Sequence, residues 1–206
     1  MNVPHASHMG GVWERQIRTV RSILSSLLSQ HGGQLHDESL NTLMVEAEAV
    51  VNSRPLTTDS STDEFGVLSP NRLLTQKSTV VLPPPGDFQQ ADQYSKKRWR
   101  RVQYLANQFW CRWRQDFLQS LQQRQKWLRP AKNLHVGDLV LIKEDNTVRN
   151  KWKLARIEST MPSKDGLVRK VKLRTASSCK DHHFLERPVT KLVLLMSEDS
   201  DGVSSN

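Results

Sequence analysis

The sequence has few cysteines and no long apolar run, and each shortage excludes a class of protein. Only two cysteines, Cys111 and Cys179, occur in 206 residues, and they lie far apart in the chain. They could form one disulfide, but this usage favours a reduced intracellular protein. The mean hydropathy is −0.60, and no apolar run approaches the roughly 18 residues that cross a membrane. We therefore expect no membrane partner.

Familiar targeting and catalytic signals are missing as well. The first residues, MNVPHASHMGG, lack a basic segment followed by an apolar core, so they do not resemble a signal peptide. No Ser/His/Asp arrangement or Gly-rich phosphate loop is present. Cys179, His182 and His183 lack the second ligand pair that a zinc site needs. His5 and His8 flank a predicted helix and are expected to be loop residues.

Positive charge is what the sequence has in excess. The formal net charge is +9 and the pI is about 9.8, which favours a polyanionic partner, with nucleic acid ahead of an acidic membrane surface. Between Lys96 and Lys132 there are eleven Lys or Arg residues and one acid, Asp116. The same segment holds four of the six tryptophans: Trp99, Trp110, Trp113 and Trp127. These rings could stack on bases, or they could pack the segment against its neighbours.

The first half of the chain predicts helices. One apolar stripe at helical spacing consists of Trp13, Ile17, Val20, Leu24, Leu27 and Leu28, and it ends at HGG, residues 31–33. A second stripe follows a cap at Asp37 and stops before Pro55; its members are Leu40, Leu43, Met44, Ala47, Val50 and Val51. LSPNRLLT predicts a short helical turn with Ser69 as cap and Pro70 in the first turn.

After the stiff spacer LPPPGD, residues 82–87, the pattern predicts one long helix over residues 93–127. The period then changes to the alternation of β-strands. VGDLVLIKE, WKLARIEST, VRKVKLRTA and RPVTKLVLL predict strands, with a turn at SKDG. Four or five short strands in about 60 residues predict a small antiparallel barrel or sandwich. The last residues, SEDSDGVSSN, are polar and acidic and are expected to be disordered.

One carboxylate stands at the start of the first helix, ahead of Arg15, Arg18 and Arg21. Ordinary helix physics offers one explanation. A carboxylate is favourable near a helix N-terminus, and Glu14 with Arg18 forms an i,i+4 pair worth about 0.3–0.5 kcal/mol. On that explanation this is a solvated helix face without a special role.

The motifs taken together resemble a known family. In their order and spacing, ASHMGGVWERQIRTVRSIL, VVNSRPLT, LSPNRLLT, the Trp-rich basic helix and VGDLVLIKED…WKLARI…RPVTKLVLL resemble the C-terminal part of a BEL/Pao-type retrotransposon integrase. The resemblance implies an α+β protein in four parts. These are the helical tail of a truncated RNase H-like core (1–82), a Pro-rich spacer with a long basic linker helix (83–132), a small SH3-like antiparallel β-barrel (133–196), and an acidic tail (197–206).

The resemblance also implies a role for Glu14. In such integrases two aspartates and one glutamate hold two Mg²⁺ or Mn²⁺ ions, which activate the attacking oxygen and stabilise the leaving oxygen of a phosphoryl displacement. Glu14 matches that glutamate, and Arg15, Arg18 and Arg21 match residues that contact the DNA. Asp37, Asp59 and Asp63 follow Glu14 in the chain and cannot replace aspartates that should precede it. We therefore expect an incomplete metal site, no cofactor for this chain alone, and no catalysis by it.

Two further expectations come from the same resemblance. The first two helices should be poorly packed, because their apolar stripes lack the central sheet of the core. The barrel should bind DNA with little sequence preference, through phosphate contacts from Lys143, Arg149, Lys151, Lys153, Arg156, Arg169, Lys170, Lys172 and Arg174. The plainer alternative is that strand lysines only protect exposed sheet edges.

The resemblance thus implies DNA as partner, self-association as in integrases, and a nuclear location, or a cytoplasmic one before integration. A competing hypothesis is a host-retained interaction or chromatin-associated protein that uses the barrel as a protein-binding module. That role would need an aromatic cage, and the barrel segment contains only Trp152 and Phe184 as aromatic residues.

Overall fold

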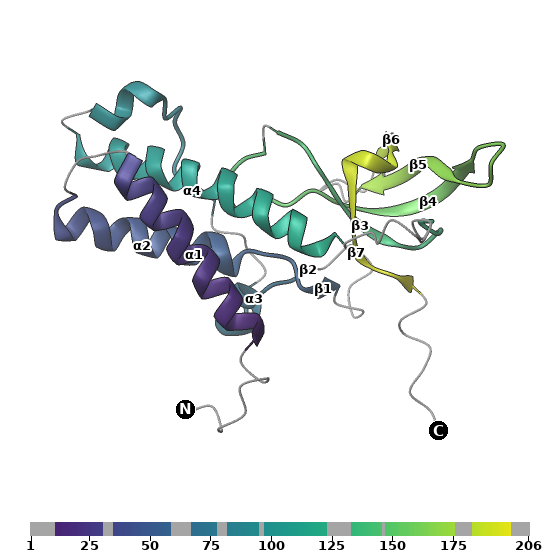
Figure 1. The fold of residues 1–206 in the computed structure, drawn as a ribbon, viewed down its shortest axis with the longest axis horizontal. Coiled ribbons are helices and arrows are strands. Elements are labelled where there is room, and N and C mark those ends of the chain that lie inside the picture. Colours follow the sequence, from purple (N-terminus) through teal and green to yellow (C-terminus); the bar gives the residue numbers. More distant parts are fainter. Residues whose placement is uncertain are drawn as a thin grey trace. The chain divides into compact units, whose positions relative to one another are not determined.

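The computed structural model describes residues 11–30, 35–58, 67–77, 82–94, 97–122, 133–145, 147–175 and 183–198. It shows an α+β protein, as the sequence predicts, with helices and a five-stranded antiparallel sheet (Figure 1). The chain divides into two compact units, Met1–Val51 with Pro83–Phe117, and Asn52–Leu82 with Leu118–Asn206. The units do not follow the predicted boundaries at residues 82 and 132, because each unit contains segments from more than one predicted part. No helix in the described part of the chain is long and apolar enough to span a membrane.

The first unit is built from three helices: α1 (Gly11–Gln30), α2 (Asp37–Asn52) and α4 (Arg98–Leu121). Their apolar stripes provide its core. The buried members are Ile23, Leu24 and Leu27 of α1, Leu43, Ala47 and Val50 of α2, and Val102, Leu105, Ala106, Phe109 and Trp113 of α4. Polar contacts also join α4 to the other two helices. The Arg112 guanidinium donates to Ser26 Oγ (3.0 Å) of α1, and Gln103 Nε2 donates to Glu46 Oε1 (2.9 Å) of α2.

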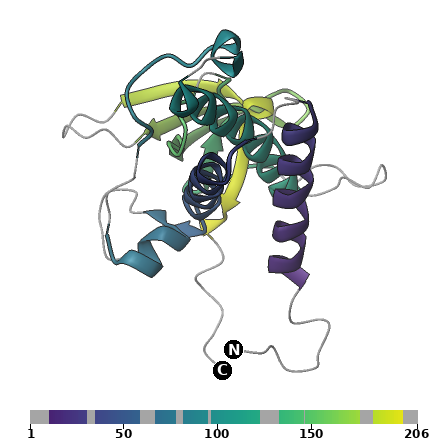
Figure 2. The same ribbon diagram turned by 90° about the vertical axis from the view of Figure 1, so that its left-hand side faces the viewer.

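The N-terminal half of α1 is poorly covered. Trp13 and Ile17 belong to the apolar stripe predicted for this helix, but they are 48% and 45% exposed. Figure 2 shows α1 (purple) along its length and α2 (dark blue) nearly end-on, so the two helices cross steeply. Steeply crossed helices contact each other over a short distance only, and the stripe of α1 beyond that contact stays open to solvent.

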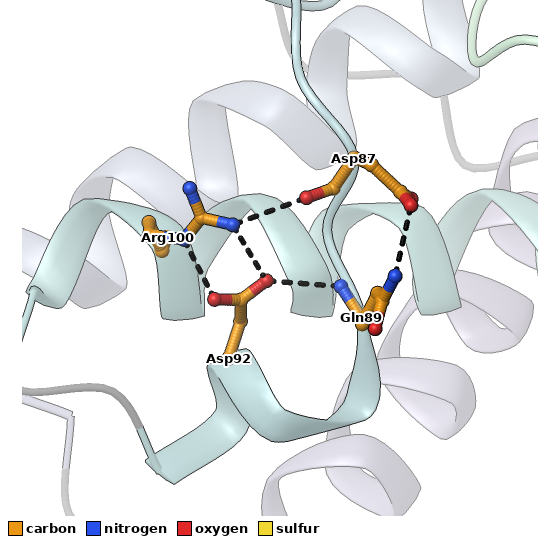
Figure 3. A network of polar contacts seen from close by, with 4 residues as sticks. All are labelled: Asp87, Gln89, Asp92 and Arg100. Atoms are coloured by element: carbon orange, nitrogen blue, oxygen red, sulfur yellow. Dashed lines mark hydrogen bonds and ion pairs between the residues drawn. The ribbon is translucent and has the colours of Figure 1, made fainter.

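A short segment ahead of α4 is fastened to it by polar and aromatic contacts that the sequence analysis did not anticipate. This segment includes the 3₁₀-helix η1 (Gln90–Tyr94), and α4 begins at Arg98, not at residue 93. The Arg100 guanidinium donates to both carboxylate oxygens of Asp92, at 2.6 and 3.1 Å, and to the Asp87 carbonyl at 3.1 Å (Figure 3). Arg100 also lies over the ring of Phe88, which packs edge-on against Trp99. The predicted end of the helix at residue 127 lies outside the described residues.

The second unit contains the sheet, with strands β3 (Leu139–Ile142), β4 (Leu154–Pro162), β5 (Val168–Thr175), β6 (His183–Pro188) and β7 (Leu192–Met196). The strand order is β6-β5-β4-β3-β7, and every pairing is antiparallel. One face carries a core of Val140, Ile142, Ala155, Ile157, Val171, Leu173 and Leu192. The register shifts within the β3–β7 and β4–β5 pairings, and irregularities of this kind bend a strand.

The sheet is not closed into a barrel, so that part of the prediction is wrong. Within the described residues, β6 and β7 are edge strands that do not pair with each other. The three-residue 3₁₀-helix η2 (Val189–Lys191) joins them, and Val189 packs against the core there. The chain thus crosses from one sheet edge to the other by a short helical turn, and no ladder of hydrogen bonds seals the gap. The predicted last strand, RPVTKLVLL, accordingly covers the end of β6, then η2, then β7.

Short elements from before residue 77 complete the second unit. Strands β1 (Thr57–Thr58) and β2 (Val67–Leu68) pair with each other. They precede helix α3 (Pro70–Thr75), which starts as predicted, with Ser69 Oγ accepting the Arg72 N–H and Pro70 in the first turn. The loop after α2 is held to the sheet region by Trp152, whose indole N–H donates to Ser53 Oγ at 3.2 Å.

Candidate nucleic-acid interface

Four cations lie together on one face of the sheet. Lys170, Lys172 and Arg174 alternate along β5, and the residues between them, Val171 and Leu173, point into the core on the other face. Arg156 of β4 stands opposite Arg174 in the register. We call Arg156, Lys170, Lys172 and Arg174 the cationic sheet face. It contains four of the twelve side chains for which the sequence predicts nucleic-acid contacts.

Three of these four cations have a carboxylate neighbour. Lys170 Nζ lies 2.5 Å from Oε2 of Glu186 on β6. Arg156 Nη1 lies 3.7 Å from Glu198 Oε1, and Arg174 Nε lies 3.7 Å from Glu158 Oε2. All six side chains are at least one-third exposed. Exposed ion pairs of this kind contribute about 0–1 kcal/mol, so a phosphate group can compete with the carboxylates for these cations.

The Lys170–Glu186 pair is the shortest of the three and leaves an electrostatic signature. The hydrogen bond from Lys170, and then its charge, lower the pKa of the Glu186 carboxyl, and the nearby charge of Lys172 lowers it slightly further. Glu186 therefore stays ionised at neutral pH and reduces the positive potential of the face. The fourth cation, Lys172, lies 4.7 Å above the ring of Phe184, which is 49% exposed. One side of that ring is thus already occupied by a cation of the same chain.

The remaining predicted cations of this unit lie elsewhere. Arg169 lies where the register between β4 and β5 shifts, and its guanidinium lies 2.6 Å from Asp165 in the turn between these strands. Lys153 pairs with Glu144, and Lys151 is exposed. Lys143 is half-buried, and its pKa is lowered by burial and by the charge of Lys191.

Arg149 does not fit the prediction of a surface phosphate contact. Its side chain is only 2% exposed, so a phosphate could not reach it unless the surrounding chain opened. The sequence could not reveal this, because Arg149 lies in a polar stretch that gives no sign of burial. We therefore leave Arg149 out of the interface.

The predicted residues of α1 lie in the other unit. Glu14, Arg15, Arg18 and Arg21 are all exposed. Within the described part of the chain, Glu14 and Arg18 form no ion pair, and no group of three His, Cys, Asp or Glu side chains could hold a metal ion. A single carboxylate does not fit the two-metal site that the resemblance implies. We derive no metal-dependent step for this chain.

The tryptophans of α4 divide between the two roles considered for them. Trp110 and Trp113 are 3% and 2% exposed, and Trp113 stacks between Phe109 and Phe117 with centroid distances of 6.4 Å. Both therefore belong to the core and cannot stack on bases. Trp99 is half-exposed, while Trp127 lies outside the described residues.

The cysteine and histidine candidates are only partly described. Cys111 carries a free, exposed thiol. Cys179, His182, His5 and His8 lie outside the described residues. The expectation that Cys179, His182 and His183 form no zinc site therefore stays a prediction.

Comparison with known proteins assigns no activity. A family model described as a family of unknown function, DUF5641, matches residues 97–195. The match spans α4 and almost all of the five-stranded sheet, so it includes the whole cationic sheet face. No curated protein and no solved structure matches the chain.

Proposed function

We propose that this protein is the C-terminal part of a BEL/Pao-type retrotransposon integrase and that it binds DNA with little sequence preference through the cationic sheet face. The observation that carries the proposal is the gathering of four cations from two neighbouring strands on the sheet face that does not carry the core. The order of the sequence motifs supports the integrase assignment, and the net charge of +9 supports a polyanionic partner. A DNA-binding role of this kind belongs in the nucleus, or in the cytoplasm before integration.

The geometry of β5 suits a phosphate backbone. Alternate residues along a strand are about 6.7 Å apart, and one strand of B-DNA carries a phosphate for every 3.4 Å or so of helix axis. Measured along the helix axis, the spacing of Lys170, Lys172 and Arg174 therefore corresponds to about two phosphate steps. A contact surface of this type reads charge and spacing, and it contains no element that enters a groove to read base edges.

The carboxylates around the cationic sheet face set the expected strength of binding. Each phosphate contact to Arg156, Lys170 or Arg174 replaces an existing exposed ion pair. The net gain per contact is therefore small, and most of the driving force comes from the release of counterions. We expect weak binding that is strongly sensitive to salt.

Catalysis is not part of the proposed function of this chain. In an intact integrase Glu14 would be one of three metal ligands, and the described residues supply no companions for it. We expect the purified chain to join no DNA strands in Mg²⁺ or Mn²⁺. Metal-dependent joining above the level of a Glu14→Gln control would contradict this.

The competing role as a chromatin-associated protein reader has less support. Its aromatic cage would have to use Phe184 and Trp152, the two aromatic residues in the described part of the sheet region. Lys172 lies over one face of Phe184, and Trp152 donates its indole N–H to Ser53. One open face of a single ring is less than the cage of several aromatic rings that binds a methylated lysine.

A charge-neutralisation experiment tests the proposal. Fluorescence anisotropy with a labelled duplex would compare the wild type with the triple variant Lys170→Gln/Lys172→Gln/Arg174→Gln. Loss of three contacts should lower the slope of log K against log[salt] by about 2.7. The matched control is Arg169→Gln, which removes a cation of the same strand that is held by Asp165 at the β4–β5 turn, and it should leave the slope nearly unchanged. If the triple variant and Arg169→Gln lower the slope equally per charge removed, the cationic sheet face is not a defined interface.

A further inference from the structure

Exposed aromatic rings and exposed cations occur close together in the chain where α4 begins. Trp99, in the first turn of α4, is 49% exposed, and Tyr94, the last residue of η1, is 81% exposed. Lys97 and Arg98 stand between them in the sequence and are exposed as well. We call Tyr94, Lys97, Arg98 and Trp99 the aromatic–basic patch. It belongs to the first unit, whereas the cationic sheet face belongs to the second.

The indole of Trp99 is braced by its neighbours without being enclosed. The Phe88 ring packs against it at a centroid distance of 5.3 Å and an interplanar angle of 78°. Phe88 in turn lies close to Gly86, where a Cβ would be 3.1 Å from the Phe88 ring. The Arg100 guanidinium lies 5.6 Å from the centroid of the same ring, and Asp92 holds it there. An exposed ring that is already fixed loses little conformational entropy when a ligand stacks on it.

The charges around the aromatic–basic patch favour an anionic ligand. Residues 82–94 and 97–101 contain two carboxylates and four cations, which are Lys97, Arg98, Arg100 and Arg101. The Asp92 carboxylate is taken up by Arg100, and the Asp87 carboxylate accepts the Gln89 side-chain amide (Figure 3). The first turn of α4 contains no acidic residue. The exposed cations of the patch are therefore in excess, next to open aromatic surface.

We propose that the aromatic–basic patch binds a single strand of nucleic acid, with unpaired bases stacked on Trp99 and Tyr94 and phosphates held by Lys97 and Arg98. Aromatic rings interleaved with cations bind single strands in this way, and they tolerate any sequence because every base has a π-face. In a duplex the bases stack on one another, so a surface ring reaches a base only where the strand is unpaired. The proposal goes beyond duplex binding, and it does not depend on the cationic sheet face.

Fluorescence anisotropy with two short labelled DNA strands tests the stacking. One strand is oligothymidylate, and the other has the same length and backbone but abasic sites throughout. Both carry the same charge, so the cationic sheet face contributes equally to both. The wild type should bind the strand with bases at least about fivefold more tightly. The same comparison with ribose strands distinguishes RNA from DNA: a preference for bases in either series supports the proposal.

Variants separate stacking from a bracing role of the rings. Tyr94→Ala/Trp99→Ala should reduce the preference for bases to less than about twofold, and Tyr94→Phe/Trp99→Phe should retain most of it, because phenyl rings keep a π-face. Thermal melting by circular dichroism accompanies both variants. If Trp99 only braces Phe88, the alanine variant melts at a lower temperature but keeps the wild-type ratio of the two affinities. The comparison of the two strands on the wild type needs no variant at all.

The salt dependence of single-strand binding tests the cations. Lys97→Gln/Arg98→Gln should lower the slope of log K against log[salt] by about 1.4, since each contact to a single strand contributes about 0.7. The matched control Lys77→Gln/Lys164→Gln removes two exposed cations outside the patch and should leave the slope nearly unchanged. The proposal is overturned if the wild type binds strands with and without bases equally in both the DNA and the RNA series. A preference that survives in Tyr94→Ala/Trp99→Ala, or equal slopes in the two lysine and arginine variants, would overturn it too.

Discussion

Replacing Glu186 by Gln should make the protein bind DNA more tightly. The Glu186 carboxylate lies 2.5 Å from Lys170 Nζ and competes with any phosphate for that ammonium group. Both side chains are about half exposed, so the pair is weak. Its loss should change an equilibrium constant by about twofold to fivefold. Lys170 contacts a phosphate in both proteins, so the slope of log K against log[salt] should stay nearly the same.

The substitution isolates one charge with little change in shape. Because Lys170 holds the pKa of Glu186 below its usual value, the wild-type carboxylate is ionised at about pH 6 to 8. The difference between the two proteins should therefore be constant across that range. The assay is duplex anisotropy at several salt concentrations, with Asp165→Asn as the matched control. Asp165 lies in the turn between β4 and β5, where it pairs with Arg169, so that variant adds the same net charge outside the cationic sheet face.

Two results would refute the reasoning. If Glu186→Gln and Asp165→Asn increase affinity equally, DNA responds only to net charge and not to the cationic sheet face. If neither variant binds more tightly, the ion pairs do not compete with phosphate at all.

Three further predictions concern stability and the proposed metal ligand. The pKa of the Asp92 carboxyl is lowered, mainly by the hydrogen bond from Arg100. The ionised carboxylate therefore stabilises the fold fully above about pH 4, and this stabilisation is lost as the pH falls through the folded-state pKa. The melting temperature should therefore fall more in the wild type than in Asp92→Asn between about pH 5 and pH 2. Phe109→Ala, at a fully buried position, should lower the free energy of unfolding in urea by about 3–5 kcal/mol, whereas Val45→Ala, 64% exposed on α2, should stay within about 0.5 kcal/mol of the wild type. Glu14→Gln should leave duplex affinity within about twofold, because Glu14 is exposed on α1 and is no phosphate contact.

The helices and most strands follow from local patterns. Ser69 and Pro70 begin α3 as predicted, because capping and the fixed backbone of proline act within one turn. Strand β6 was not predicted as a separate strand. It lies at a sheet edge, and its side chains are exposed or half-buried throughout, so its sequence lacks the apolar alternation that identifies a strand.

The cationic sheet face could be predicted only in part, because local patterns place its cations but not its carboxylates. Alternation alone places Lys170, Lys172 and Arg174 on one face of β5. Their neutralising carboxylates come from other segments, at Glu186 on β6, at Glu158 beside the register shift in β4, and at Glu198 after β7. Those pairings depend on strand register and on irregularities in it, which no short stretch of sequence encodes.

The uncovered stripe of α1 depends on tertiary structure in a similar way. The spacing of Trp13 and Ile17 correctly indicates an apolar face. How much of that face is covered depends on the crossing of α1 and α2, which the periodicity of either helix leaves open. The spacing therefore predicts the apolar face of α1, and only the fold shows that Trp13 and Ile17 on this face are half-exposed.

The salt dependence of duplex binding tests the central claim most directly. Four phosphate contacts, one from each cation of the cationic sheet face, predict a slope of log K against log[salt] near −3.6 or so for wild-type protein on B-DNA. The slope should fall to about −0.9 when only Arg156 remains, in the triple variant Lys170→Gln/Lys172→Gln/Arg174→Gln. A flat salt dependence of the wild type, or a triple variant whose slope equals that of the wild type, would contradict the account.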